Sequence, residues 1–190
     1  GSWGLISIDN KRITSADYLS IRPFDTQYFI ASVPGHYLNL PRYGLLNKKG
    51  KPVTSFDYMS ISKHAEHYLL LDQYQDGRSQ KGLYDMYNEV MILPCRYRDI
   101  VSRYGLWLAS LPNGKTKIVQ QDGKPLCAHT FDKIHEQDQG LGVELAGQYG
   151  WINTKGQLVF QPIHKRIKRK AAYDFNSWEL IDKINNQVLD

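Results

Sequence analysis

Two short stretches of the chain combine residue types that can bind a metal or move protons. His64 and His67 are three residues apart, and a zinc site would need a third and a fourth ligand beside them. No such ligand is close in the sequence, so we interpret both as surface histidines in a loop between strands. Residues 135–138 read His-Glu-Gln-Asp and join acid and base types, but no nucleophile accompanies them. We predict no catalytic residue, no metal site and no cofactor, and hence a protein that is not an enzyme.

The two cysteines, Cys95 and Cys127, lie at similar places in consecutive copies of a repeated segment. Two cysteines form neither a disulfide framework nor a metal site by themselves. Their separation by one repeat makes a disulfide between them conceivable. We favour the alternative, in which both are buried free thiols that pack as small apolar groups.

The net charge of +5 is concentrated in one run, because residues 164–170 hold five of the 24 lysines and arginines. One interpretation is a patch that binds an acidic partner or phosphates. The other, which we favour, is an exposed terminal strand whose charges oppose pairing with another chain. The run contains no aromatic residue that could stack on bases, so we expect no nucleic acid. The candidate partner-binding residues are Lys165, Arg166, Lys168, Arg169 and Lys170.

The elements that carry these residues come from a segment that recurs five times. Its copies begin at Trp3, Tyr43, Lys81, Thr116 and Tyr149, at spacings of 33 to 40 residues. A period of this length is typical of stacked supersecondary units, none of which buries its apolar face alone.

Each copy is expected to supply four short strands and no helix. A first and a second strand flank a polar turn, an alternating segment forms the third strand, and an apolar run forms the fourth. In the second copy these strands are predicted near 43–46, 51–54, 57–62 and 68–73. Short turns join the fourth strand to the next first strand, so the sheet order should be third-fourth-first-second across two copies. The turn holds a residue that tolerates positive φ, at Asn10, Gly50, Asn88, Gly123 and Gly156.

Other recurring positions favour structural roles. Asp57 and Asp132 precede third strands and are expected to cap local backbone amides. The glycine after the first aromatic residue should mark a close backbone approach or a bulge. Trp107 and Trp178 occupy matching places on fourth strands and are expected to pack in the core.

The repeated motif resembles that of the WG-repeat (KWG-repeat) proteins of bacteria, and the resemblance covers nearly the whole chain. The aromatic-glycine pair occurs at Trp3-Gly4, Tyr43-Gly44 and Tyr149-Gly150, and the later Phe-Asp motif at 56–57 and 131–132. The third copy keeps only Gly82, and Thr116-Lys117 in the fourth copy keeps neither residue of the pair. The resemblance implies a repeat scaffold, often attached to other domains, with no shared enzymatic activity and no functional residues to transfer.

Together these observations predict an all-β fold of one domain, residues 1–190, stacked as an open superhelical array; the alternative is a closed, five-bladed, propeller-like ring. We expect a non-enzymatic scaffold for protein–protein interaction, within a larger bacterial protein, whose partner is another protein or another domain of the parent chain. The alternative is a glycan-binding module that uses surface Tyr and Trp. We find no signal peptide, and apolar runs of five or six residues fall short of the ~18 that cross a bilayer. The compartment is not indicated.

Overall fold

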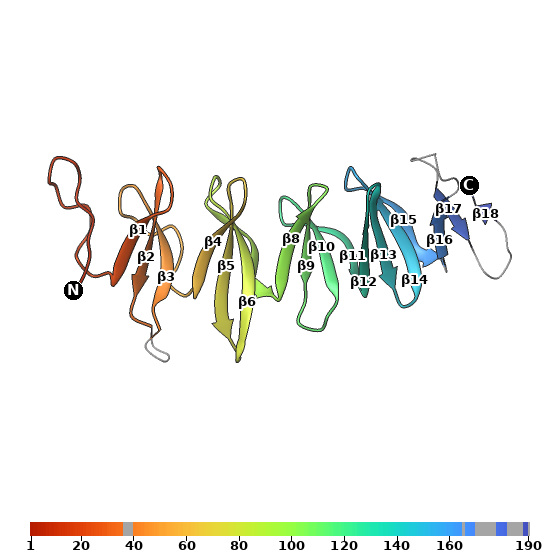
Figure 1. Cartoon of the computed structure of the whole chain (residues 1–190), viewed down its shortest axis with the longest axis horizontal. Coiled ribbons are helices and arrows are strands. Elements are labelled where there is room, and N and C mark those ends of the chain that lie inside the picture. Colours follow the sequence, from red (N-terminus) through yellow and green to blue (C-terminus); the bar gives the residue numbers. More distant parts are fainter. Residues whose placement is uncertain (36–39, 165, 170–177, 182–187, 190) are drawn as a thin grey trace. The chain divides into compact units, whose positions relative to one another are not determined.

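The computed structural model describes residues 1–35, 40–164, 166–169, 178–181 and 188–189, with side chains as far as Ile163. These residues contain no helix and form antiparallel strands throughout (Figure 1). The prediction of an all-β chain is therefore confirmed. No helix of the described residues is long and apolar enough to cross a membrane.

The chain divides into two compact units, Gly1–Arg96 and Tyr97–Asp190. The prediction of a single domain stays a prediction. In the first unit, one sheet has the order β1 (Ser20–Pro23), β2 (Tyr28–Val33), β3 (Arg42–Asn47). The second sheet has the order β4 (Ser60–Ala65), β5 (Tyr68–Gln75), β6 (Arg78–Asp85), β7 (Val90–Tyr97).

The second unit contains three further sheets. One has the order β8 (Asp99–Arg103), β9 (Leu106–Ser110), β10 (Thr116–Gln120), β11 (Pro125–Phe131). The next has the order β12 (Lys133–Gln137), β13 (Gly140–Leu145), β14 (Gln148–Asn153), β15 (Leu158–His164). The last consists of β16 (Arg166–Arg169), β17 (Trp178–Ile181) and β18 (Val188–Leu189).

Each four-stranded sheet joins two sequence repeats, as the turn lengths predict. Strands β4 and β5 are the third and fourth strands of the second copy, and β6 and β7 are the first and second strands of the third copy. The sheets β8–β11 and β12–β15 follow the same order. Within the described ranges, no sheet pairs strands of the first copy with strands of the last, so the strand pairing is open rather than closed.

The predicted strand at 51–54 is wrong, because the second strand of that copy is reduced to isolated bridges between Leu46 and Pro52 and between Tyr43 and Tyr58. The predicted third strand also begins later, at Ser60. A side chain replaces part of the ladder, since the Leu45 amide donates to Thr54 Oγ1 at 2.9 Å. Pro52 has no amide hydrogen to donate, which further limits regular pairing.

The turn between first and second strands adopts positive φ at Asn10, Gly50, Gly123 and Gly156, as predicted. In the third copy the prediction is wrong, because Glu89 and not Asn88 has the positive φ, of 52°. Asp85 accepts hydrogen bonds there from the amides of Tyr87 and Asn88 and from the Asn88 side chain. The two strands are separated by residues 86–89, as many as the 121–124 and 154–157 of later copies, but the left-handed position lies one residue later, at Glu89.

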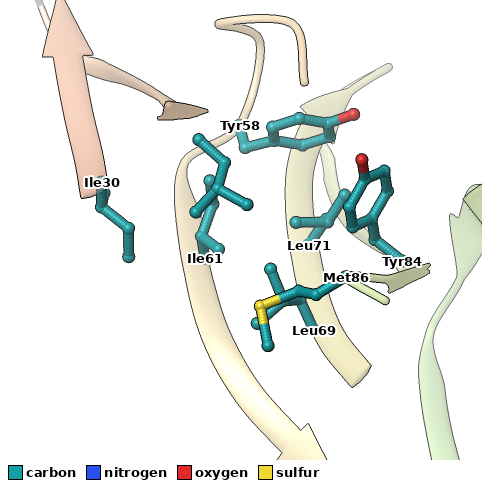
Figure 2. Packing of buried hydrophobic residues seen from close by; sticks show 8 residues of the cluster. Ile30, Tyr58, Ile61, Leu69, Leu71, Tyr84 and Met86 are labelled. Carbon is teal, nitrogen blue, oxygen red and sulfur yellow. The ribbon is translucent and has the colours of Figure 1, made fainter. Parts of the chain in front are cut away.

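The first unit has a hydrophobic core made by both of its sheets. Figure 2 shows Ile30 of β2, Ile61 of β4 and Leu71 of β5 in one cluster, together with Tyr84 of β6. Leu45, Leu69 and Leu71 have no exposed surface. Burying one such side chain stabilises a fold by about 1.5–3 kcal/mol, so the apolar alternation of the repeats provides the cohesion between neighbouring sheets.

The second unit has an equivalent core between the β8–β11 and β12–β15 sheets. Its members are Leu106, Leu108, Ile118, Phe131, Leu141, Val143 and Ile152. Trp107 of β9 is also buried, with 2% of its surface exposed, which confirms its predicted packing role. The side chain of Trp178 lies outside the described residues.

Candidate binding surfaces

The histidines that sequence analysis weighed as ligands lie in ordinary structural surroundings. His64 belongs to strand β4, which corrects its predicted place in a loop, and His67 lies in the turn before β5. His67 Nε2 is 3.5 Å from Asp85 Oδ1, and its ring centroid is 4.2 Å from that of Tyr68. Burial alone would raise the pKa of Asp85, but hydrogen bonds from Asn88 and Tyr87 hold that pKa below its usual value. Among the described residues no group of three or more His, Cys, Asp or Glu is placed to hold a metal ion.

The first three residues of the His-Glu-Gln-Asp stretch belong to strand β12. Glu136 Oε2 pairs with Arg103 Nε at 2.6 Å, and His135 Nε2 is 3.6 Å from Glu144 Oε2. Arg103 belongs to β8 of the preceding sheet, and Glu144 belongs to β13, which pairs with β12, so these side chains tie β12 to other strands.

Both cysteines are free thiols, as favoured, but they are half-buried and not buried as predicted. Cys95 packs against the core of the first unit, and Cys127 packs against the core of the second. Burial, with a smaller contribution from Asp72, raises the pKa of Cys95 to about 11. A thiol in this environment is a poor nucleophile near neutral pH, because the thiolate is the reactive form.

The glycine of the aromatic-glycine pair marks a close backbone approach, as predicted. A Cβ atom on Gly82 would lie 2.7 Å from Cys95 Sγ, and one on Gly150 would lie 2.6 Å from the Phe160 carbonyl oxygen. The register of β14 against β15 shifts between Tyr149 and Trp151, on either side of Gly150. The glycine therefore accommodates an irregularity of the partner strand.

Asp132 does not form the predicted local turn. Its Oδ2 accepts a hydrogen bond from the Ala146 amide at 2.7 Å, and its Oδ1 lies 2.9 Å from Lys115 Nζ. The amide of Ala146 and then the Lys115 ammonium hold the pKa of Asp132 below its usual value. Local side-chain caps occur at other residues, such as Asp25, which accepts from the amides of Gln27 and Tyr28.

The basic run includes an edge strand. Arg166–Arg169 forms β16, which pairs with β17 and lies at one edge of the sheet β16-β17-β18. Lys165 and Lys170 lie outside the described residues, and the side chains of the run are not described. Residues 166–169 of the run thus form an edge strand, in line with the terminal strand that sequence analysis favoured.

A groove of about 480 Å³ lies between the two sheets of the first unit, and sequence reasoning missed it. Its polar wall includes Arg42 at the start of β3, Gln73 of β5, and Ser55 and Asp57 of the segment before β4. Phe56 and Tyr74 supply aromatic surface, and Tyr74 is 43% exposed. The Phe-Asp motif at 56–57, which supplies two of the lining residues, is the sequence signal that could have pointed to it.

The first strand of the first copy is another exposed surface. Trp3 is 61% exposed and Ile6 is 66% exposed. The strand bridges only to its own copy, through Trp3 with Tyr18 and Ile6 with Arg12. Its outer edge has no strand partner within the described residues.

Comparisons with known proteins agree with the resemblance to the WG-repeat family. The model of the WG containing repeat matches residues 149–168, which include the aromatic-glycine pair of the fifth copy, most of β14 and all of β15. No curated protein matches the chain.

Solved structures that resemble the chain do so only distantly. Hsv2 of Kluyveromyces lactis is 12% identical with a TM-score of 0.34, over 87% of this chain and 60% of that one. A TolB structure from Agrobacterium tumefaciens is 11% identical with a TM-score of 0.30, over 77% of this chain and 66% of that one. The chain thus spans about 60% of the length of Hsv2. Scores this low carry no argument about this protein.

Proposed function

We propose that the chain is a non-enzymatic β-repeat scaffold that binds another protein, or another domain of its parent chain, as one module of a larger bacterial protein. The matched WG repeat and the recurring third-fourth-first-second sheets support a scaffold. Stacked repeats build extended surfaces that suit macromolecular partners.

One observation carries the proposal: a position that is buried in four copies of the repeat is exposed in the first. Ile6 is 66% exposed. The equivalent residues of the other copies are Leu46 at 0%, Tyr84 at 4%, Val119 at 1% and Ile152 at 0%.

The difference has a simple structural cause. In the other four copies, a fourth strand pairs with the first strand, as β2 pairs with β3 and β5 pairs with β6. The first copy offers the same edge without such a strand among the described residues. An exposed apolar strand edge accepts an extended segment by β-strand addition, with main-chain hydrogen bonds for affinity and side-chain contacts for specificity.

The test is capture of proteins from bacterial lysate on the immobilised chain, compared for the native chain and Ile6→Lys. A lysine at this position would place a charge where the added strand must pack. We expect retention of the specific partner to fall about tenfold or more, which corresponds to the loss of one buried isoleucine contact. Tyr87→Lys is the matched control, because Tyr87 is 84% exposed in the same unit but lies at the turn between β6 and β7.

Glycan binding is the second candidate, favoured by the exposed rings of Trp3, Tyr74 and Tyr87. The same immobilised chain should be applied to a glycan array. Binding of a glycan class without any retained protein would replace the scaffold proposal. Equal retention of the protein partner by the native chain and by Ile6→Lys would show that this strand edge is not the binding surface of the scaffold.

A further inference from the structure

The groove of the first unit contains two charged side chains that do not pair with each other. Arg42 and Asp57 both line it, yet no ion pair joins them within the described residues. Arg42 Nη1 is buried and has no hydrogen-bond partner in the part of the chain that the structure describes. A buried charged donor without a partner is costly and points to a missing ligand group.

The fourth copy of the repeat shows the position of Arg42 when it is paired. Lys115 directly precedes Thr116 as Arg42 precedes Tyr43. Thr116 pairs with Phe131 and Tyr43 bridges to Tyr58, so Asp132 takes the place of Met59 and not that of Asp57. Lys115 Nζ lies 2.9 Å from Asp132 Oδ1, and Asp132 also accepts the Ala146 amide. The second copy has a methionine where the fourth has this carboxylate, so Arg42 lacks the partner that Lys115 has.

We propose that the open groove binds an acidic side chain from an extended segment of the partner protein, with Arg42 as the residue that holds its carboxylate. The proposal rests on the proposed function, since it takes the partner to be a protein. A guanidinium binds a carboxylate through parallel N–H donors, which suits the unpartnered Nη1 of Arg42. Phe56 and Tyr74 then contact the apolar residues that flank the acidic one.

Asp57 distinguishes a peptide from an acidic sugar. Asp57 lines the same groove and is exposed, so a ligand in the groove can donate to its carboxylate. A peptide supplies backbone N–H groups or a basic side chain next to its acidic residue. A uronic acid supplies no cation and would place a second carboxylate near Asp57, which is unfavourable.

The experiment uses the full chain and two capped peptides, acetyl-Ala-Leu-Glu-Leu-Ala-amide and its Gln counterpart, in NMR titrations of the labelled protein. We expect the Glu peptide to bind about tenfold more tightly, as a charge-assisted hydrogen bond in place of a neutral one implies. The amides of Ser55, Gln73 and Tyr74 should shift. Arg42→Gln should abolish the preference for Glu.

Lys115→Gln is the matched control, because it removes a positive charge from the matching position of the fourth copy, where Lys115 is paired with Asp132. This variant should keep the preference for the Glu peptide. Equal affinity for the Glu and Gln peptides in the native chain would overturn the proposal, whether or not Arg42→Gln folds. Binding of glucuronate at Ser55, Gln73 and Tyr74 in place of the Glu peptide would assign the groove to acidic sugars. Ile6→Lys could lose the partner while the native chain shows no preference for the Glu peptide. That result would overturn the groove proposal alone and leave the scaffold proposal standing.

Discussion

The glycine of the aromatic-glycine pair acts through its missing side chain and not through its backbone freedom. Gly44, Gly82 and Gly150 do not adopt positive φ. A Cβ at Gly44 would lie 2.8 Å from the ring of Phe56, and one at Gly150 would lie 2.9 Å from the nitrogen of Pro162. The aromatic-glycine pair therefore fixes how closely the segment after the turn can approach the first strand.

We predict that Gly150→Ala destabilises the second unit by about 1–3 kcal/mol, the usual cost of forcing an extra methyl into a packed site. The contacts that it would meet are backbone atoms, the Phe160 oxygen at 2.6 Å and the Pro162 nitrogen at 2.9 Å, which cannot rotate away. Urea unfolding followed by circular dichroism measures the change in the free energy of unfolding.

Gly142→Ala is the control for this prediction. It lies on β13, which pairs with β14, and its added Cβ would approach no atom closer than 3.4 Å. It should change the free energy of unfolding by less than about 0.5 kcal/mol. Similar losses in both variants would show that the cost comes from alanine in the strand and not from the close approach.

The strands differ in how closely their bounds follow the pattern of apolar residues in the sequence. The fourth strand follows the apolar run of the sequence closely, as β5 does in the second copy, whereas the third strand of that copy, β4, begins later than predicted. The second strand varies most, from the isolated bridge at Pro52 to the eight residues of β7. Where the second strand is short, the hydroxyl oxygens of Thr14 and Thr54 accept amide hydrogen bonds in place of backbone carbonyls. Proline at position 52 also interrupts the ladder.

The basic strand gives a prediction at the scale of an element. Replacement of Lys165, Arg166, Lys168 and Arg169 with Gln should leave partner binding unchanged and promote self-association. An edge strand that loses its charges becomes a template for pairing with another chain. Light scattering after size exclusion measures the association, and the capture assay measures partner binding.

The opposite result would identify the run as a binding surface. Loss of partner binding in the Gln variant, with an affinity of the native chain that falls steeply as salt rises, is the behaviour of a site for an acidic partner or phosphates. Replacement of Lys48, Lys49 and Lys51 with Gln, at the turn after β3, is the control for a general loss of charge.

At the scale of the whole molecule, stability is divided between local cores. The cluster around Leu69 and Leu71 belongs to the first unit, and the cluster around Leu141 and Val143 belongs to the second. The two clusters share no residue. Such an arrangement is expected of repeats that contact mainly their neighbours.

We predict that Leu69→Ala and Leu141→Ala each cost about 2–5 kcal/mol in the free energy of unfolding of their own unit. Both leucines are fully buried, so each truncation leaves a cavity. The double variant should show the sum of the two losses within about 0.5 kcal/mol, as distant sites do. Urea unfolding of the two single variants and the double variant measures this, and a larger interaction energy would contradict the division into separate cores.

The sequence alone determined the repeat, the absence of helix among the described residues, and the strand order within the sheets. These properties depend on neighbours a few residues apart: alternation specifies strands, and a turn residue that tolerates positive φ specifies the hairpin. For the same reason local reasoning placed Gly50, Gly123 and Gly156 correctly. It missed Glu89, which takes positive φ one residue later, in a turn where Asp85 accepts the Asn88 amide.

Only the tertiary structure decided which surfaces are available. Ile6 and Leu46 occupy the same place in the repeat. Their exposure differs because, among the described residues, a fourth strand pairs with the first strand of the second copy and none pairs with that of the first copy. Arg42 and Lys115 also match in sequence, but the second is paired with Asp132 and the first lines an open groove. Whether the basic residue at this position is paired depends on which later residue lies opposite the first strand, Asp132 in the fourth copy and Met59 in the second. That register joins residues too far apart along the chain for a local pattern to encode.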